Sequence, residues 1–369
     1  MSKFAVLIFC GCIALLTGCG TTPEPPPTEW SASNPVAQPG TPAAAAPVVQ
    51  TNLPEVVATN PPAPVTTPSA TNAMPLPVYT WTSLKRWAQA QPVSGPRLLT
   101  KSPLVTYAVS SPRGDMVLAI GSKEAAWNGV TVHLGFAPEI IDGEVYVHGL
   151  DLQKSFAPLL CLPPPAFGPN RVVVIDPGHG GMNAGTLSIT DRRPEKEFTL
   201  DWARRLQPLL EREGWQVILT RTNDVDMALS NRVTVAEIHH ADLFISLHFN
   251  SLAPDQKPVG LATFCLTPMG LPSTLTREYP DIPTQFYPNN NYDAQNVQVA
   301  ERLQRALLRT TGLEDRGVSR ARFIGVLRGQ HRPAVLIEAG FLSNPQEAHR
   351  IENPEFRQKL AEAVAAALK

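Results

Sequence analysis

The chain has 369 residues, a length typical of two or three domains, but only 17% of its residues are charged. It contains 38 prolines, with a dense group in the N-terminal part, so we do not expect that part to be globular. A formal net charge of −1 and a sequence without a basic stripe exclude nucleic acid from the expected partners.

The first residues have the form of a bacterial signal sequence. Lys3 precedes an apolar run that is too short to span a bilayer and that ends in Leu16-Thr-Gly-Cys19. This ending resembles the lipobox of bacterial lipoproteins, which implies a lipid on the Cys19 thiol. Gly20, in place of aspartate, implies a location in the cell envelope at the outer membrane, facing the periplasm. The alternative is an ordinary signal peptide with a chance cysteine.

A Pro/Ala/Thr-rich tract follows at residues 20–75, and we expect it to be a disordered tether. It has few large apolar side chains, so burial cannot offset the entropy lost on ordering. A tether on a lipid anchor suits a folded domain that must reach a polymer away from the membrane. We therefore assign residues 1–19 to the signal peptide and lipobox, and residues 20–75 to the tether.

Residues 76–162 are predicted to form a small α+β module. A segment at residues 78–90 starts extended and turns helical, and strand-like runs follow at residues 105–109, 116–120 and 130–134. The stretch 139–150 resembles the small N-terminal repeat of copper amine oxidases, which implies a structural or wall-binding role without copper chemistry. Trp81, Trp87 and Trp127 are candidates for stacking on sugars, and core packing is the alternative.

After a proline-rich break, strand and helix patterns alternate over residues 170–369. Apolar runs at residues 172–176, 242–248 and 334–340 are typical of parallel strands buried on both faces, and further strands are expected at 215–221 and 261–266. Helices are expected at residues 199–212, 231–240 and 295–311, and a last helix follows Asn353-Pro354. This alternation predicts an α/β fold with a largely parallel sheet and helices on both faces.

Three of the buried strands end beside polar residues. They lead into Asp176-Pro-Gly-His179-Gly-Gly, His248-Phe-Asn250 and Glu338-Ala-Gly. Because ligands bind beyond the carboxyl ends of strands in open α/β sheets, one site can collect all three. A glycine-rich turn can also cradle phosphate, but the lysine and the spacing of a phosphate loop are missing here.

Two histidines and a carboxylate are the ligand set of a catalytic zinc site with an open fourth position. We expect Glu195 to be the carboxylate, because helical spacing places it on the apolar face of Phe198 and Trp202. Glu197, two residues later, falls on the polar face. The alternative is that Glu195 only interacts favourably with the helix dipole.

Several further residues receive predictions with a structural alternative. Asp176 is expected to orient a ligand histidine, with capping of its strand as the alternative. Asn250 and Arg328 are candidate donors that bind substrate, and structural roles are the alternative. Cys161 and Cys265 lie in apolar runs without metal-site spacing, so buried free thiols are expected, with a disulfide as the alternative.

The motifs together resemble a known enzyme family. Asp176-Pro-Gly-His-Gly-Gly, Glu195-Lys196 before a helix, Ser246-Leu-His-Phe-Asn and the run from Pro333 to Asn344 are similar to the zinc-dependent N-acetylmuramoyl-L-alanine amidases that separate daughter cells. The resemblance covers residues 170–369 and implies that His179, Glu195 and His248 bind Zn²⁺ and that Glu338 is the catalytic carboxylate. One departure is an extra Pro/Asn/Tyr-rich loop at residues 268–292, a region where some relatives carry a regulatory helix.

The activity that this resemblance implies is hydrolysis of the amide bond between N-acetylmuramic acid and L-alanine in peptidoglycan by zinc-activated water. A zinc peptidase acting within the wall peptide and a non-catalytic wall-binding lipoprotein are the alternatives. The expected partners are peptidoglycan and, through Cys19, the membrane. The resemblance also admits an activator protein, and we expect a monomer.

Overall fold

The structure is a computed structural model that describes residues 80–277 and 281–369. The predicted signal peptide, the lipidation site at Cys19 and the predicted tether lie outside the described residues. Within the described ranges, no helix combines the length and the apolar character that crossing a bilayer requires. Cys161 and Cys265 are both free thiols, of which Cys265 is buried.

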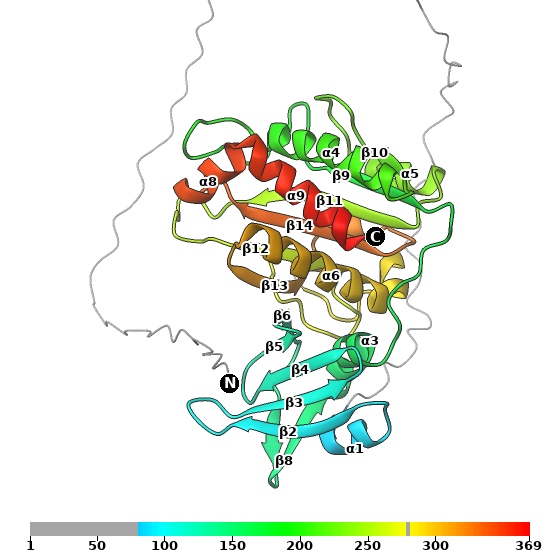
Figure 1. Cartoon of the computed structure of the whole chain (residues 1–369), viewed down its shortest axis with the longest axis vertical. Helices are drawn as coiled ribbons and strands as arrows, with labels where there is room; N and C mark the ends of the chain where they lie inside the picture. The colour runs from blue at the N-terminus through cyan, green and yellow to red at the C-terminus, as the bar shows by residue number, and fades with distance from the viewer. Residues whose placement is uncertain (1–79, 278–280) are drawn as a thin grey trace, which may run out of the picture. The chain divides into compact units, whose positions relative to one another are not determined.

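A largely parallel sheet forms the centre of the C-terminal region (Figure 1). Its strands are β9 (Val172–Pro177), β10 (Gln216–Leu219), β11 (Leu243–Asn250), β12 (Leu261–Cys265), β13 (Asp315–Arg320) and β14 (Ala334–Phe341). They lie in the order β10-β9-β11-β14-β12-β13, and every neighbouring pair is parallel except β12 with β14. The predicted α/β fold is confirmed. β13 contains several charged residues and a glycine, so its pattern did not predict a strand.

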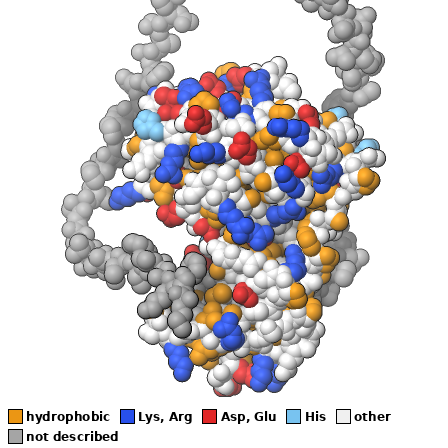
Figure 2. Space-filling model, viewed as in Figure 1, with side chains coloured by type: hydrophobic (Ala, Val, Ile, Leu, Met, Phe, Trp, Pro, Cys, Tyr) orange, Lys and Arg blue, Asp and Glu red, His pale blue; other side chains and the backbone are white. Residues whose placement is uncertain are grey.

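Helices cover both faces of this sheet, as predicted. Helices α4 (Glu195–Arg212), α6 (Asp293–Thr311) and α9 (Pro354–Ala367) pack over one face, and α5 (Leu229–Ile238) and α7 (Gly325–Arg328) pack over the other. Alternation along β9 shows the two faces, because Val173 and Ile175 pack with the first group of helices and Val174 packs with the second. On the face seen in Figure 2, side chains of both charge signs are interspersed.

The helix boundaries follow from capping chemistry. The side chain of Asn353 accepts a hydrogen bond from the Glu355 amide and caps α9, as the sequence predicts. Helix α6 ends at Gly312, which adopts a left-handed conformation with φ of 64°. Helix α4 begins at Glu195, one turn earlier than the apolar pattern alone suggests. A short helix that the pattern did not predict, α8 (Pro345–Glu352), is capped by Asn344.

The region before residue 162 adds strands and short helices. They are β1 (Trp81–Ser83), α1 (Leu84–Gln89), β2 (Ser94–Thr100), β3 (Thr106–Ser111), β4 (Gly114–Ala119), β5 (Glu124–Trp127), β6 (Val130–His133), β7 (Glu139–Ile141), β8 (Glu144–His148), α2 (Gly149–Asp151), η1 (Leu152–Phe156) and α3 (Ala157–Leu160). β7 and β8 form a hairpin that runs into helix, which is the strand-turn-strand-helix pattern that the sequence predicts at 139–150. Trp127 is buried in the core and Trp87 packs edge-on against Phe156, whereas Trp81 is half-buried.

Strands β2 to β6 continue the central sheet. β6 pairs in parallel with β13, so the eleven strands form one sheet across both regions. The Thr131 amide donates to the Asp315 carboxylate at 2.7 Å, and His133 Nε2 lies 3.0 Å from the Arg316 carbonyl oxygen. The N-terminal module therefore shares a sheet and a hydrophobic core with the C-terminal region.

Candidate functional site

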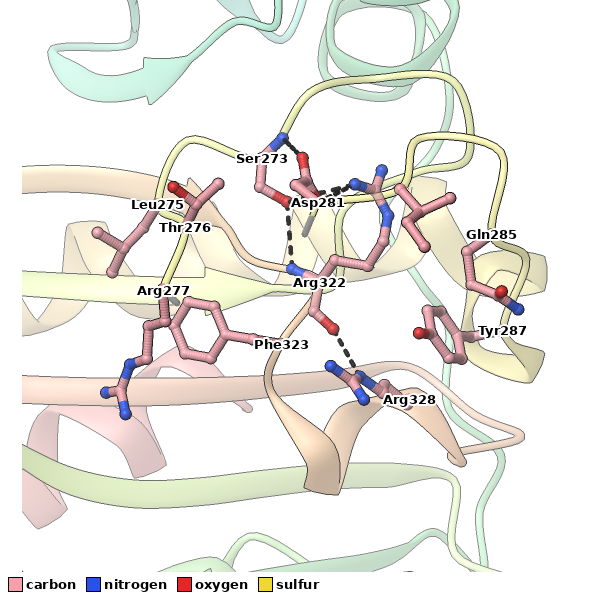
Figure 3. Close-up of a pocket in the computed structure, with 11 residues that line it drawn as sticks. Ser273, Leu275, Thr276, Arg277, Asp281, Gln285, Tyr287, Arg322, Phe323 and Arg328 are labelled. Atoms are coloured by element: carbon pink, nitrogen blue, oxygen red, sulfur yellow. Dashed lines mark hydrogen bonds and ion pairs between the residues drawn. The ribbon is translucent and has the colours of Figure 1, made fainter. Parts of the chain in front are cut away.

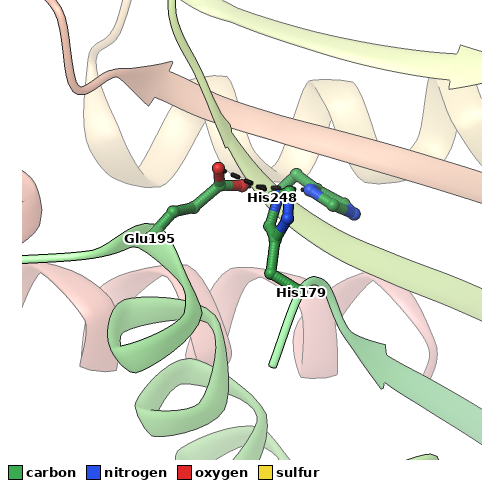
Figure 4. Close-up of side chains that lie close together, drawn as sticks. All are labelled: His179, Glu195 and His248. Atoms are coloured by element: carbon green, nitrogen blue, oxygen red, sulfur yellow. Dashed lines mark hydrogen bonds and ion pairs between the residues drawn. The ribbon is translucent and has the colours of Figure 1, made fainter. Parts of the chain in front are cut away.

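Three predicted ligands converge at the carboxyl ends of β9 and β11 (Figure 4). His179 lies in the turn after β9, Glu195 is the first residue of α4, and His248 lies on β11. One nitrogen of each imidazole and one carboxylate oxygen all lie within 4.8 Å of one another. The two imidazole rings stand nearly perpendicular, with their centroids 4.8 Å apart. Residues from three separate segments thus form a single cluster.

The Glu195 carboxylate is at the centre of this cluster. Its Oε2 lies 3.0 Å from His179 Nε2, and its Oε1 lies 3.0 Å from His248 Nδ1. The backbone amides of Thr186 and Phe249 donate to the same two oxygens at 3.1 and 3.0 Å. Burial alone would raise the pKa of Glu195, but the hydrogen bonds and charges of the two histidines outweigh it and lower this pKa to about 2. Glu195 is therefore ionised at neutral pH, as a metal ligand must be.

The orientation of His179 is fixed from its other side. Its Nδ1 lies 2.9 Å from Asn183 Oδ1, which also accepts a hydrogen bond from the Gly185 amide. Because an amide oxygen only accepts, Nδ1 carries the proton and Nε2 is left to face Glu195. Burial lowers the pKa of His179, but the hydrogen bond and charge of Glu195 together with the hydrogen bond to Asn183 give a net increase. Its backbone adopts a φ of 62°, in the left-handed region that few non-glycine residues occupy.

Two glycines make room for the ligands. A Cβ atom on Gly178 would lie 2.2 Å from Cε1 of His248. A Cβ atom on Gly185, which has a φ of +70°, would lie 2.6 Å from a carboxylate oxygen of Glu195. A side chain at either position would push a ligand out of place. The glycines in this turn are thus required by the close approach of the histidines and the glutamate.

Asp176 does not contact a histidine, so the prediction that it orients one directly is wrong. Its Oδ1 accepts hydrogen bonds from Thr220 and Arg232 at 2.6 and 2.5 Å, and its Oδ2 accepts one from Ser246 at 2.8 Å. Arg232 also donates to the backbone carbonyl of His179 at 2.7 Å. Asp176 therefore holds Arg232, and Arg232 holds the backbone of the histidine turn.

Glu338 lies beside the three ligands. In the register of β11 and β14 it is directly opposite His248, and the alternation of both strands places the two side chains on the same face of the sheet. Its Oε2 is buried and has no hydrogen-bond partner among the described residues. Burial and the nearby charge of Glu195 raise the pKa of Glu338 well above its usual range, and the charge of Arg277 acts in the opposite direction.

This arrangement fits a divalent metal ion. The cluster offers two imidazole nitrogens and an ionised carboxylate, which is a common protein donor set for zinc. Beside it, Oε2 of Glu338 is a buried polar atom without a partner among the residues that the structure describes. The His179, Glu195 and His248 side chains are therefore suited to hold a zinc ion, and Glu338 is placed to act on what binds next to it.

A cleft with a volume of about 380 Å³ opens over the cluster. It is lined by His179, Thr186, Glu195, Leu229, His248, Phe249, Asn250, Ser251, Phe264, Leu275, Arg277, Phe323, Ile324, Gly325, Val326, Leu336 and Glu338. Asn250 is thus in the cleft, whereas Arg328 is not among the lining residues and lies in a neighbouring cavity. Arg277 lines the cleft although sequence reasoning did not select it, since a lone arginine in a loop carries no motif.

Comparison with known proteins identifies the family. Residues 173–369 match the family described as N-acetylmuramoyl-L-alanine amidase. The chain is 32% identical over 243 residues to the N-acetylmuramoyl-L-alanine amidase AmiC of Escherichia coli O6:H1, which covers 59% of this chain and 58% of that protein. It is 30% identical over 208 residues to the germination-specific N-acetylmuramoyl-L-alanine amidase of Bacillus subtilis, covering 53% and 76%. The crystal structure of an N-acetylmuramoyl-L-alanine amidase from Clostridium difficile 630 aligns with a TM-score of 0.46 at 29% identity, covering 55% and 96%.

The chain spans 58% of the length of the Escherichia coli relative. The family match extends over more than half of the chain, and it includes the turn after β9, the start of α4 and the ends of β11 and β14, where the site lies. The chain therefore belongs to the N-acetylmuramoyl-L-alanine amidase family.

Proposed function

We propose that this chain hydrolyses the amide bond between N-acetylmuramic acid and L-alanine in peptidoglycan, with a zinc ion held by His179, Glu195 and His248. The observation that carries the proposal is the convergence of these three ligands beside the Glu338 carboxylate. Membership of the amidase family supports the choice of bond. The same donor set would also serve a peptidase, so the bond must be tested directly.

In this proposal Glu338 carries out the proton transfers. Zinc, when bound, would activate water for attack and polarise the scissile carbonyl. Glu338 takes the proton of the attacking water, because its oxygen Oε2 has no other partner among the described residues. It then delivers a proton to the nitrogen of L-alanine as the carbon–nitrogen bond breaks. The products are a free carboxylate on the muramic acid side and a free amine on the peptide.

One side chain of the cleft is placed to orient the substrate. Asn250 ends β11 beside His248, and its side-chain oxygen accepts a hydrogen bond from the Ser251 amide at 2.7 Å. This bond leaves the NH₂ group of Asn250 to donate to a substrate carbonyl. Arg328 donates through Nε to the Arg322 carbonyl oxygen at 2.6 Å and stacks over Tyr287, which favours a structural role for it.

Purified sacculi and metal analysis test the function. Chelation should abolish hydrolysis and added zinc should restore it, with zinc content followed in parallel. Mass spectrometry of the products should show peptides that begin with L-alanine and glycan strands without peptide. Cleavage inside the peptide would instead establish the peptidase alternative. Full activity in metal-free protein would overturn the zinc mechanism, and zinc-loaded protein that leaves sacculi uncut would favour the wall-binding alternative.

The N-terminal predictions complete the proposal. A lipid on Cys19 and a tether over residues 20–75 would place the module at 76–162 and the amidase domain at 170–369 on the periplasmic side of the outer membrane. Cys19→Ser should move the protein out of the membrane fraction without changing the hydrolysis of soluble muropeptides. A wild-type protein without lipid by mass spectrometry would contradict the anchor. The activator protein and the monomeric state stay predictions. Pull-down experiments on the full chain can test the first, and sedimentation-velocity experiments can test the second.

A further inference from the structure

Residues 267–277 bring side chains to one side of the cleft. They follow β12 and include the first part of the extra loop that the sequence shows at 268–292. Leu275 and Arg277 from this segment line the cleft together with the ligands and Glu338. The same two residues, with Phe323, also line a smaller neighbouring cavity of about 70 Å³ (Figure 3). This segment therefore contributes directly to the surface that a substrate meets.

The N-terminal module holds this segment. Leu271 is fully buried, and a Cβ on Gly135 of the module would lie 2.6 Å from Cδ2 of Leu271. The Thr274 amide donates to the Arg320 carbonyl oxygen at 2.9 Å, and Arg320 Nη2 donates to the Lys154 carbonyl oxygen of the module at 2.7 Å. Because these contacts fix the chain just before Leu275, Arg277 extends from an anchored support.

Arg277 differs from the two other arginines of the small cavity. Arg322 pairs with the Asp281 carboxylate and donates to two backbone carbonyls, so its charge is neutralised within the fold. Arg328 donates to the carbonyl oxygen of Arg322. Arg277 is exposed, and across residues 80–277 and 281–369 its guanidinium has no hydrogen bond or ion pair.

The aromatic ring of Phe323 supports the Arg277 guanidinium. The guanidinium carbon lies 4.7 Å from the ring centroid, and Figure 3 shows the two side chains next to each other. Contact with the ring restricts the guanidinium, and its N–H donors have no partner among the described residues. Such a guanidinium matches the geometry of a carboxylate, to which it can donate two parallel hydrogen bonds.

We propose that Arg277 is a specificity-determining residue that binds a carboxylate of the peptide portion of the wall strand while the scissile amide lies at Glu338. The inference rests on the proposed function, because it takes the peptide as the substrate. Arg277 binds a peptide carboxylate and not the scissile amide, so it selects peptides that bear a free carboxylate. Residues 267–277 thus present a substrate-binding side chain from a segment that the N-terminal module holds.

The test compares two soluble muropeptides that differ only in whether the peptide carboxylates are free or amidated. Arg277→Met in the full-length protein should raise KM for the free-carboxylate muropeptide about tenfold, since a charge-assisted bidentate contact is lost. Any change in kcat caused by the loss of the Arg277 charge near Glu338 should be the same for both muropeptides. KM for the amidated muropeptide should stay within about twofold of wild type. For the free-carboxylate muropeptide, KM of Arg277→Lys should lie between those of wild type and Arg277→Met. Lysine keeps the positive charge but lacks the two parallel donors of a guanidinium.

Arg316→Met is the matched control. Arg316 is also exposed and stacks on a ring, with its guanidinium carbon 5.1 Å from the Phe341 centroid, but it does not line the cleft. Binding measured by calorimetry in a Glu338→Gln background should repeat the selective loss without turnover. An equal loss on both muropeptides, no loss on either, or the same effect from Arg316→Met would overturn the inference alone. A wild-type enzyme that cuts neither muropeptide would overturn the proposed function, and the inference with it.

Discussion

The two walls of the cleft are built in different ways. On one wall, His179, Glu195 and His248 satisfy one another and are held by backbone amides, by Asn183 and by strand ends. On the other, Leu275 and Arg277 are exposed, and the Arg277 guanidinium lies over the Phe323 ring without a hydrogen bond or ion pair to any described residue. The hydrogen bonds around His179, Glu195 and His248 keep these three side chains in one geometry, as a metal site requires. The Arg277 charge, which has no ion-pair partner among the described residues, can bind a substrate.

Two buried carboxylates of the first wall, Glu195 and Glu338, also differ in their surroundings. Glu195 lies among donors that lower its pKa to about 2, whereas burial raises the pKa of Glu338 well above its usual range. The two carboxylates thus differ in what surrounds them, although both belong to the same wall. This difference is consistent with the proposal that Glu195 holds a metal and that Glu338 transfers protons.

The largest expected effect comes from Glu195→Ala. Glu195 is buried at the centre of the cluster, whereas Glu197, on the same first turn of α4, is exposed. Removing a ligand should weaken zinc binding by about 100-fold or more and abolish activity, since even the loss of a ligand's partner weakens it by about 10- to 100-fold. Glu197→Ala should differ from wild type by under about 0.5 kcal/mol in stability. The measurement is the zinc content of both purified variants. Equal zinc contents would contradict the assignment of Glu195 as a zinc ligand.

Glu338→Gln separates proton transfer from metal binding within the same wall. The variant keeps the shape of the side chain but cannot accept the proton of water, so kcat should fall by a factor of about 100 or more. Zinc content should stay at the wild-type level, because Glu338 is not one of the three clustered ligands. A variant that purifies without zinc would show that Glu338 is a ligand and that its proposed role is wrong.

Gly178→Ala tests how tightly the first wall is packed. The added Cβ would lie 2.2 Å from the His248 ring, so we expect the ring to move, with a loss of about 1–3 kcal/mol in stability and reduced zinc affinity. Gly168→Ala is the control, because its Cβ would have no atom within 4 Å. Thermal unfolding with and without zinc measures both effects. A fully active and stable Gly178→Ala variant would mean that the histidine turn is more adaptable than its geometry indicates.

The smallest effect concerns Glu301, a buried carboxylate away from both walls. Burial raises its pKa to about 7, and Arg305 at 3.3 Å offsets burial only in part. The folded state therefore binds this proton more tightly than the unfolded state, and the free energy of unfolding falls as pH rises from about 4.5 to 7. Glu301→Gln should be more stable than wild type by about 1–3 kcal/mol at pH 8, with the difference vanishing below about pH 4. Urea unfolding at both pH values measures it, and a pH-independent difference would contradict the raised pKa.

Local patterns were enough to predict the catalytic wall. Continuous apolar runs identified β9, β11 and β14, and the residues at their carboxyl ends are among those that meet at the site. Helical spacing placed Glu195 inward and Glu197 outward, and their burial confirms it. These features depend on the periods of strands and helices, which the residues themselves carry. The ligand and catalytic roles stay predictions until the variants are measured.

Only the tertiary structure decided the opposite wall and the joining of the two regions. Arg277 reaches the cleft because Leu271 packs against Gly135 and Thr274 bonds to β13, contacts between segments far apart in the chain. The pairing of β6 with β13 likewise has no signal in the spacing of either strand. Asp176 was assigned to a histidine because the sequence could not show that Arg232 would lie between them. Such contacts follow from how distant surfaces fit together, and neither side-chain periodicity nor motif spacing encodes that fit.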